Sequence, residues 1–127
     1  MRIALVRTLV PFAPADPDGA ALVERLLDLG HDVEEVRLPF RWDADPVAQV
    51  LGIRLLELPG ADHVVALGFP ASAIRHPRLI AWRCAEGLPA AASEAVRGAH
   101  AAVLKDAAHV VPEAGSAGVE AVIRALA

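Results

Sequence analysis

Four basic side chains lie close together between residues 75 and 83 and form the densest cationic group in the chain. They are Arg75, His76, Arg78 and Arg83. Guanidinium groups bind phosphate and carboxylate oxygens through paired hydrogen bonds, so this group could hold a phosphate or a lipid-phosphate acceptor. The four residues flank an apolar strand, however, and need not share one face. The alternative is a solvated loop whose charges aid solubility, and we favour that alternative.

Cys84 and Glu86 follow the same strand, where an open parallel sheet places its ligands. Glu86 could act as a base, and Cys84 as a nucleophile, only beside an activating group. No histidine can be assigned to such a position from the sequence. We therefore favour structural roles for both residues, a thiol at the edge of the core and a carboxylate at the start of a helix.

The remaining candidates for chemistry are histidines and a glycine-rich turn. No two of the five histidines are spaced as metal ligands on a helix, and none clusters with Cys or Asp, so we expect no metal site. Residues 115–118 (GSAG) could offer N–H groups to an anion, but Ser116 as a helix N-cap explains them equally well. The chain has neither a P-loop nor a dinucleotide-binding glycine fingerprint.

The elements that must position these residues alternate between strand and helix. Apolar runs predict strands over residues 3–6, 61–68, 79–82 and 108–111, and the more polar segment 31–38 predicts a strand near the sheet edge. We expect helices from an Asp18 cap to Gly30, from Pro46 to Pro59, over residues 90–102, and over 119–126 behind a Ser116 cap, with a short helix or turn at 71–74. This order predicts a Rossmann-like α/β three-layer sandwich with about five parallel strands flanked by helices.

Composition limits the class of protein. The 127 residues fit one domain, residues 1–127, and 55% of them are hydrophobic, which is typical of a folded core. The net charge is −4 and no basic run is present, so a nucleic-acid partner is not expected. No run is long enough for a membrane span or a secretory signal, and the single cysteine favours a reducing compartment, so we expect a cytoplasmic protein.

Two groups of segments resemble the N-terminal domain of family-4 glycosyltransferases. The first comprises residues 1–6 (MRIALV), a Pro-rich loop, a helix and residues 30–34 (GHDVE). The second, which is more specific, comprises residues 36–43 (VRLPFRWD), 60–71 (GADHVVALGFPA) and 74–82 (IRHPRLIAW). The resemblance extends over nearly the whole chain. It implies the acceptor-side half of the two-domain architecture of these enzymes, called GT-B.

The resemblance also implies where a cleft would lie and what is missing from it. The candidate cleft or ligand-binding residues are Phe12, Asp18, Gly19, Phe69, Arg75, Arg83 and Glu86. In place of the family's glycine loop, residues 16–21 read DPDGAA, with carboxylates that repel phosphate. No histidine follows Trp82 where the family has one. The catalytic residues therefore remain unassigned.

The expected function follows from those departures. Family members hold their nucleotide-sugar donor mainly in a second domain, which these residues do not contain. We expect a split, remnant or non-catalytic glycosyltransferase subunit, inactive alone, that needs a donor-binding chain; a homo-oligomer is the other expected association. The nucleotide sugar would be a cofactor only if the partner domain supplied its site. The alternative is a non-catalytic Rossmann-like module that binds a small ligand or a partner.

Overall fold

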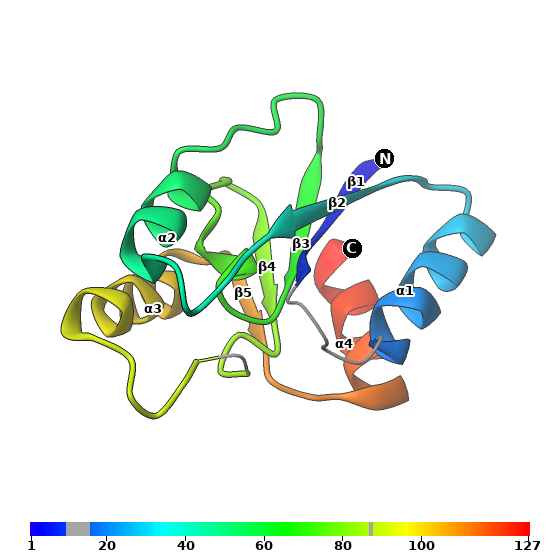
Figure 1. Ribbon diagram of the computed structural model, residues 1–127. Helices are drawn as coiled ribbons and strands as arrows, with labels where there is room; N and C mark the ends of the chain where they lie inside the picture. Colours follow the sequence, from blue (N-terminus) through cyan, green and yellow to red (C-terminus); the bar gives the residue numbers. More distant parts are fainter. Residues whose placement is uncertain (10–15, 87) are drawn as a thin grey trace.

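The computed structural model describes residues 1–9, 16–86 and 88–127 and shows one five-stranded, all-parallel sheet (Figure 1). The strand order is β2-β1-β3-β4-β5. This is one of the common doubly wound orders, in which the chain changes direction across the sheet beside β1. The strand bounds are β1 Arg2–Leu9, β2 Asp32–Pro39, β3 His63–Leu67, β4 Leu79–Trp82 and β5 His109–Val111.

Helices cover both faces of the sheet. The helix α1 (Pro17–Asp28) packs beside α4 (Gly115–Leu126) on one face. The other face carries α2 (Pro46–Arg54), α3 (Glu94–Asp106) and the short 3-10 helix η1 (Ala71–Ala73) (Figure 1). The predicted three-layer sandwich with five parallel strands is confirmed.

The alternation of side chains along β1 explains why its sequence is apolar throughout. Ile3 and Leu5 lie in the core under α1 and α4, whereas Ala4 and Val6 lie in the core under α2 and α3. Both faces are buried, so successive residues must all be apolar. The edge strand β2 has only partly buried and exposed residues, which accounts for its polar sequence.

The helix starts differ from the predicted caps in two places. Asp16, not Asp18, is the N-cap of α1, and its side chain accepts a hydrogen bond from the Asp18 backbone N–H. The helix α4 begins at Gly115 without a side-chain cap, so the predicted Ser116 cap is wrong. Both capping predictions failed because α1 and α4 each start earlier than the spacing of their apolar residues indicates.

Two other helices differ in length or position. The helix α2 ends at Arg54, short of the predicted Pro59. The helix α3 starts at Glu94, because Ser93 caps it by accepting a hydrogen bond from the Val96 N–H at 3.3 Å, and not at the predicted residue 90. Within the described ranges, no helix is long and apolar enough to cross a membrane.

The crossover from β3 to β4 fills the centre of the α2 and α3 face. It passes through η1, whose residues are buried and contact β1 and β3 as well as α2 and α3. The chain leaves β3 at the end of the sheet where the strands have their C-termini, the carboxyl edge. It enters β4 at the end where they have their N-termini, the amino edge. Residues before Leu79 consequently lie at the amino edge, and residues after Trp82 lie at the carboxyl edge.

Candidate functional site

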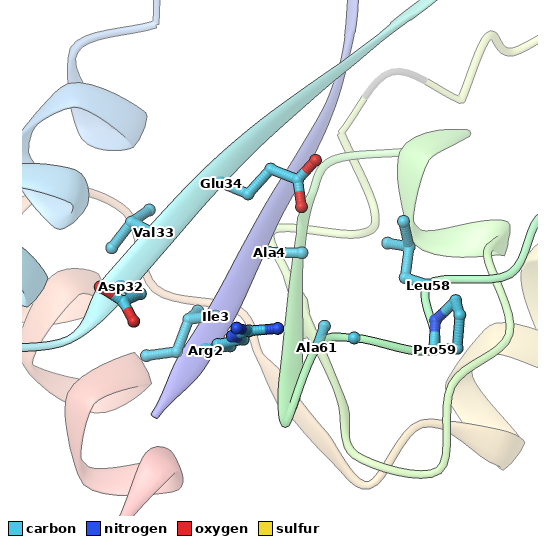
Figure 2. A pocket seen from close by; sticks show the side chains of 10 residues that line it. Arg2, Ile3, Ala4, Asp32, Val33, Glu34, Leu58, Pro59 and Ala61 are labelled. Carbon is cyan, nitrogen blue, oxygen red and sulfur yellow. The ribbon is translucent and has the colours of Figure 1, made fainter.

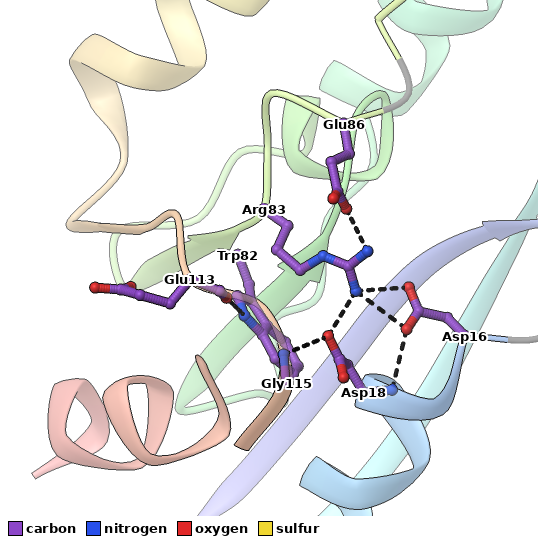
Figure 3. A network of polar contacts seen from close by, with 7 residues as sticks. All are labelled: Asp16, Asp18, Trp82, Arg83, Glu86, Glu113 and Gly115. Carbon is purple, nitrogen blue, oxygen red and sulfur yellow. Dashed lines mark hydrogen bonds and ion pairs between the residues drawn. The ribbon is translucent and has the colours of Figure 1, made fainter. Parts of the chain in front are cut away.

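An ion-pair cluster centred on Arg83 occupies the carboxyl edge of the sheet (Figure 3). Arg83 directly follows β4 and has a left-handed backbone, with φ of 53°. This turn sends its side chain across the edge towards the start of α1, where Asp16 and Asp18 lie. Glu86 closes the cluster from the loop after β4. We call Asp16, Asp18, Arg83 and Glu86 the Arg83 cluster.

The guanidinium is held by carboxylates on both of its terminal nitrogens. Nη1 lies 3.1 and 3.0 Å from the two carboxylate oxygens of Asp16 and 2.7 Å from Oδ2 of Asp18. Nη2 pairs with Glu86. The Arg83 side chain is 16% exposed and that of Asp18 14%, so this contact is shielded from bulk water, whereas Asp16 is 31% and Glu86 56% exposed. Such pairs are stronger than surface ion pairs.

The two aspartates also occupy helix N-termini. Asp16 Oδ1 accepts from the Asp18 N–H at 3.0 Å in the first turn of α1. Asp18 Oδ2 accepts from the Gly115 N–H at 3.0 Å, at the first residue of α4. Helix N-termini at the carboxyl edge of a parallel sheet are the usual positions for a ligand phosphate. In this protein the chain's own carboxylates accept one N–H at each of these two helix starts.

The charge of the Arg83 cluster opposes a second anion. Three carboxylates face one guanidinium, which leaves two negative charges. Burial alone would lower the pKa of Arg83, but Glu86 and Asp16 outweigh it and raise that pKa above its ordinary value. The guanidinium therefore stays charged and is already paired. A phosphate at this edge would meet repulsion from the surrounding carboxylates.

A buried tryptophan fixes the start of α4 beside the cluster. Trp82 is fully buried, and its Nε1–H donates to the Glu113 carbonyl at 2.7 Å. Gly118 packs directly against this contact. A Cβ at that position would lie 2.2 Å from the Glu113 oxygen and 2.7 Å from Trp82 Nε1. Close packing of α4 on Trp82 thus requires glycine at residue 118 and places the Gly115 N–H opposite Asp18.

The structure brings together Asp18, Arg83 and Glu86 of the sequence-predicted site residues. Gly19 lies next to them, buried in the first turn of α1 near Leu67. Phe12 lies outside the described residues. Phe69 is 3% exposed and packs edge-to-face on His100, so it belongs to the core.

Arg75 does not join the cluster. It precedes β4, and it lines cavities at the amino edge of the sheet, at the other end of the strand from Arg83. The basic residues 75–83 therefore form two separate groups and not one anion site. Of the candidate cleft residues, Phe69, Arg75 and Glu86 therefore lie in three different places: the core, the amino edge and the Arg83 cluster.

Asp16 and the Gly115 N–H are members of the site that the sequence analysis missed. A signal for Asp16 was present, because Asp16-Pro17 has the same pattern of an N-cap aspartate followed by proline that Asp45-Pro46 has at the start of α2. A backbone N–H has no residue-type signal. Its role becomes visible only when α4 is placed against α1.

Cys84 has no activating neighbour of the kind nucleophilic catalysis needs. The residue is 3% exposed, and burial raises the pKa of its thiol, which favours the unreactive protonated form. His100 Nε2 lies 2.9 Å from the Cys84 carbonyl oxygen and so contacts the backbone. In the described part of the chain, no three His, Cys, Asp or Glu side chains are grouped to hold a metal ion.

Three open cavities lie at the amino edge. One, of about 460 Å³, lies over the first residues of β1 and β2 and is closed on its far side by residues 58–61 (Figure 2). Two more, of about 370 and 560 Å³, share Arg75, His76 and Pro77. None of these three is lined by a described residue of the Arg83 cluster.

Comparison of the chain with known protein families, with curated proteins and with solved structures finds no match.

Proposed function

We propose that this domain is the acceptor-side half of a glycosyltransferase-like assembly and acts in it as a non-catalytic subunit. The donor-binding half would come from another domain, in the same or a second polypeptide. The resemblance of residues 36–43, 60–71 and 74–82 to family-4 glycosyltransferases supports the assignment to that assembly. The parallel α/β architecture is consistent with it.

One observation carries the non-catalytic part of the proposal. At the edge where such a domain would face its substrates, Asp16 and Asp18 accept the helix N–H groups and pair with Arg83. A catalytic cleft needs free donors aimed at developing charge on the substrate. Here both terminal nitrogens of Arg83 and one N–H at the start of each of α1 and α4 are already bound by the protein's own carboxylates, and the remaining charge of the cluster is negative. The domain would then provide the acceptor-side surface of the cleft, and the partner domain would provide the catalytic groups.

The proposal is tested with the purified chain and with a donor-binding glycosyltransferase domain encoded beside it. We expect the chain alone to transfer no sugar from uridine or guanosine diphosphate sugars, because in this proposal the donor site belongs to the other domain. Co-expressed, the two should elute as a 1:1 complex by light scattering, and only the complex should transfer sugar. Transfer by the chain alone would contradict the proposal, as would failure to form a complex with such a domain.

A second function is favoured by the position of the cavities. All three described above lie at the amino edge, away from the edge used in sugar transfer. A small-ligand-binding module that kept the fold and changed the site would have this distribution. Saturable binding of a ligand without a sugar or nucleotide, and no complex with a donor domain, would favour this second function.

A further inference from the structure

The cavity of about 370 Å³ lies between the C-terminal ends of α2 and α3, and η1 and the first residue of β4 contribute to its lining. It is at the opposite edge of the sheet from the Arg83 cluster. An inference about this cavity therefore does not depend on the proposed role in sugar transfer.

The inner part of the cavity is apolar. Ile74, Leu79 and Val103 line it, and all three belong to the buried core under α2 and α3. Exposed leucines adjoin it in the chain, since Leu55 follows the lining residue Arg54 and Leu104 follows Val103. An apolar ligand group placed here would leave water and contact carbon atoms, which is the usual source of affinity in small-molecule sites.

The charged residues of the cavity favour one negative charge on the ligand. Arg54 and Arg75 line it together with Asp106, which gives a net charge of one positive unit. Within the described residues, neither arginine forms an ion pair. Unpaired guanidinium groups are available for a carboxylate.

His76 also lines the cavity, but its ring is already committed to the backbone. Its Nε2 lies 3.1 Å from the Ala61 carbonyl, and its Nδ1 accepts from the Arg78 N–H at 3.0 Å. Both ring nitrogens therefore contact backbone groups. The cavity groups that are free to hold a ligand carboxylate are the two arginines.

A buried polar group beside the cavity lacks a partner. Ser72 lines the cavity and is completely buried, and its Oγ has no hydrogen-bond partner among the residues that the structure describes. Buried hydroxyls are nearly always hydrogen-bonded in folded proteins, because an unpaired one is costly. The wall of the cavity therefore contains one unsatisfied hydroxyl in addition to its two arginines.

We propose that this cavity binds a small amphipathic carboxylate, with its apolar body against Ile74, Leu79 and Val103 and its carboxylate at Arg54 and Arg75. An inorganic anion would leave the apolar lining unused. A neutral hydrocarbon would leave both guanidinium groups without a polar partner. A cation would be repelled by the arginines.

The test is a titration of the ¹⁵N-labelled full chain with three eight-carbon probes followed by amide NMR. Octanoate should cause saturable shifts confined to residue 54 and to residues 72–79 and 102–107. Octanamide has the same chain without the charge and should bind about tenfold more weakly, and octylammonium should not bind saturably. No saturable binding of octanoate, or equal binding of all three probes, would overturn the proposal.

Two variants and a matched control locate the carboxylate. Arg75→Gln should weaken octanoate binding about tenfold and leave octanamide binding unchanged, because only the charge-assisted contact is lost. Arg54→Gln/Arg75→Gln should abolish the preference for octanoate over octanamide. The control is Arg124→Gln, an exposed arginine of α4 on the other face of the sheet, which should change neither. An equal loss of octanoate affinity in Arg124→Gln would show a non-specific charge effect and refute the site.

Discussion

Replacing Gly118 with alanine is expected to lower the free energy of unfolding by about 3 kcal/mol or more. The added methyl group would lie 2.2 Å from the Glu113 carbonyl oxygen and 2.7 Å from Trp82 Nε1. Neither neighbour is the end of a flexible chain, since one is backbone and the other is a fully buried indole. The start of α4 must therefore move away from β4, and the 2.7 Å bond from Trp82 to Glu113 is lost with it.

The matched control for this substitution is Gly98→Ala in the middle of α3. A Cβ at Gly98 meets no atom within 4 Å, so alanine adds only its better helix propensity. We expect Gly98→Ala to be neutral or to stabilise the protein by up to about 1 kcal/mol. Urea unfolding followed by circular dichroism measures both. Equal stabilities of Gly118→Ala and Gly98→Ala would contradict the described packing of α4 on Trp82.

Replacing Arg83 with methionine is expected to destabilise the protein by about 2–3 kcal/mol. Methionine keeps much of the side-chain volume but leaves Asp16, Asp18 and Glu86 without their common partner. Asp18 is the most affected because it is 14% exposed and cannot be fully rehydrated in place. The repulsion among the three carboxylates then opposes the junction of α1 with α4.

Two comparisons separate this effect from the loss of an ordinary ion pair. Arg41→Met removes an exposed pair with Asp43 at 2.9 Å and should leave the stability nearly unchanged, because solvent screens exposed pairs. Adding Asp16→Asn and Asp18→Asn to Arg83→Met should raise the free energy of unfolding again by at least about 1 kcal/mol. The reason is that these two substitutions remove the carboxylate charges that Arg83→Met leaves unpaired. If the added substitutions lower the stability further, the carboxylates are not held by Arg83 in the way described.

The fold could be predicted from the sequence because burial of both sheet faces leaves a direct record in it. The all-apolar runs of β1 and β3 and the polar edge strand β2 follow from where each strand lies in the sheet. The same logic correctly placed residues after β4 at the carboxyl edge. Asp18, Arg83 and Glu86 meet there because strand ends of a parallel sheet converge on one edge.

Other parts of the site depend on contacts that residue types do not encode. Phe69 follows β3 in the chain, but it packs under His100 of α3 and does not line the edge. Arg75 is close to Arg83 in sequence, but β4 separates them by the length of the strand. The pairing of Asp18 with the Gly115 N–H depends on how closely α4 approaches Trp82, which is set by Gly118.

The central claim is that the chain's own carboxylates fill the anion position at the carboxyl edge. It is tested most directly by titrating inorganic pyrophosphate into the ¹⁵N-labelled protein and observing the amides of Asp18, Arg83 and Gly115. The wild-type chain should show no saturable shift at these amides up to about 10 mM. Asp16→Asn/Asp18→Asn, which leaves Arg83 facing one carboxylate, should bind pyrophosphate there in the millimolar range. Saturable binding by the wild type at this edge would contradict the claim, and so would an absence of binding by the double variant.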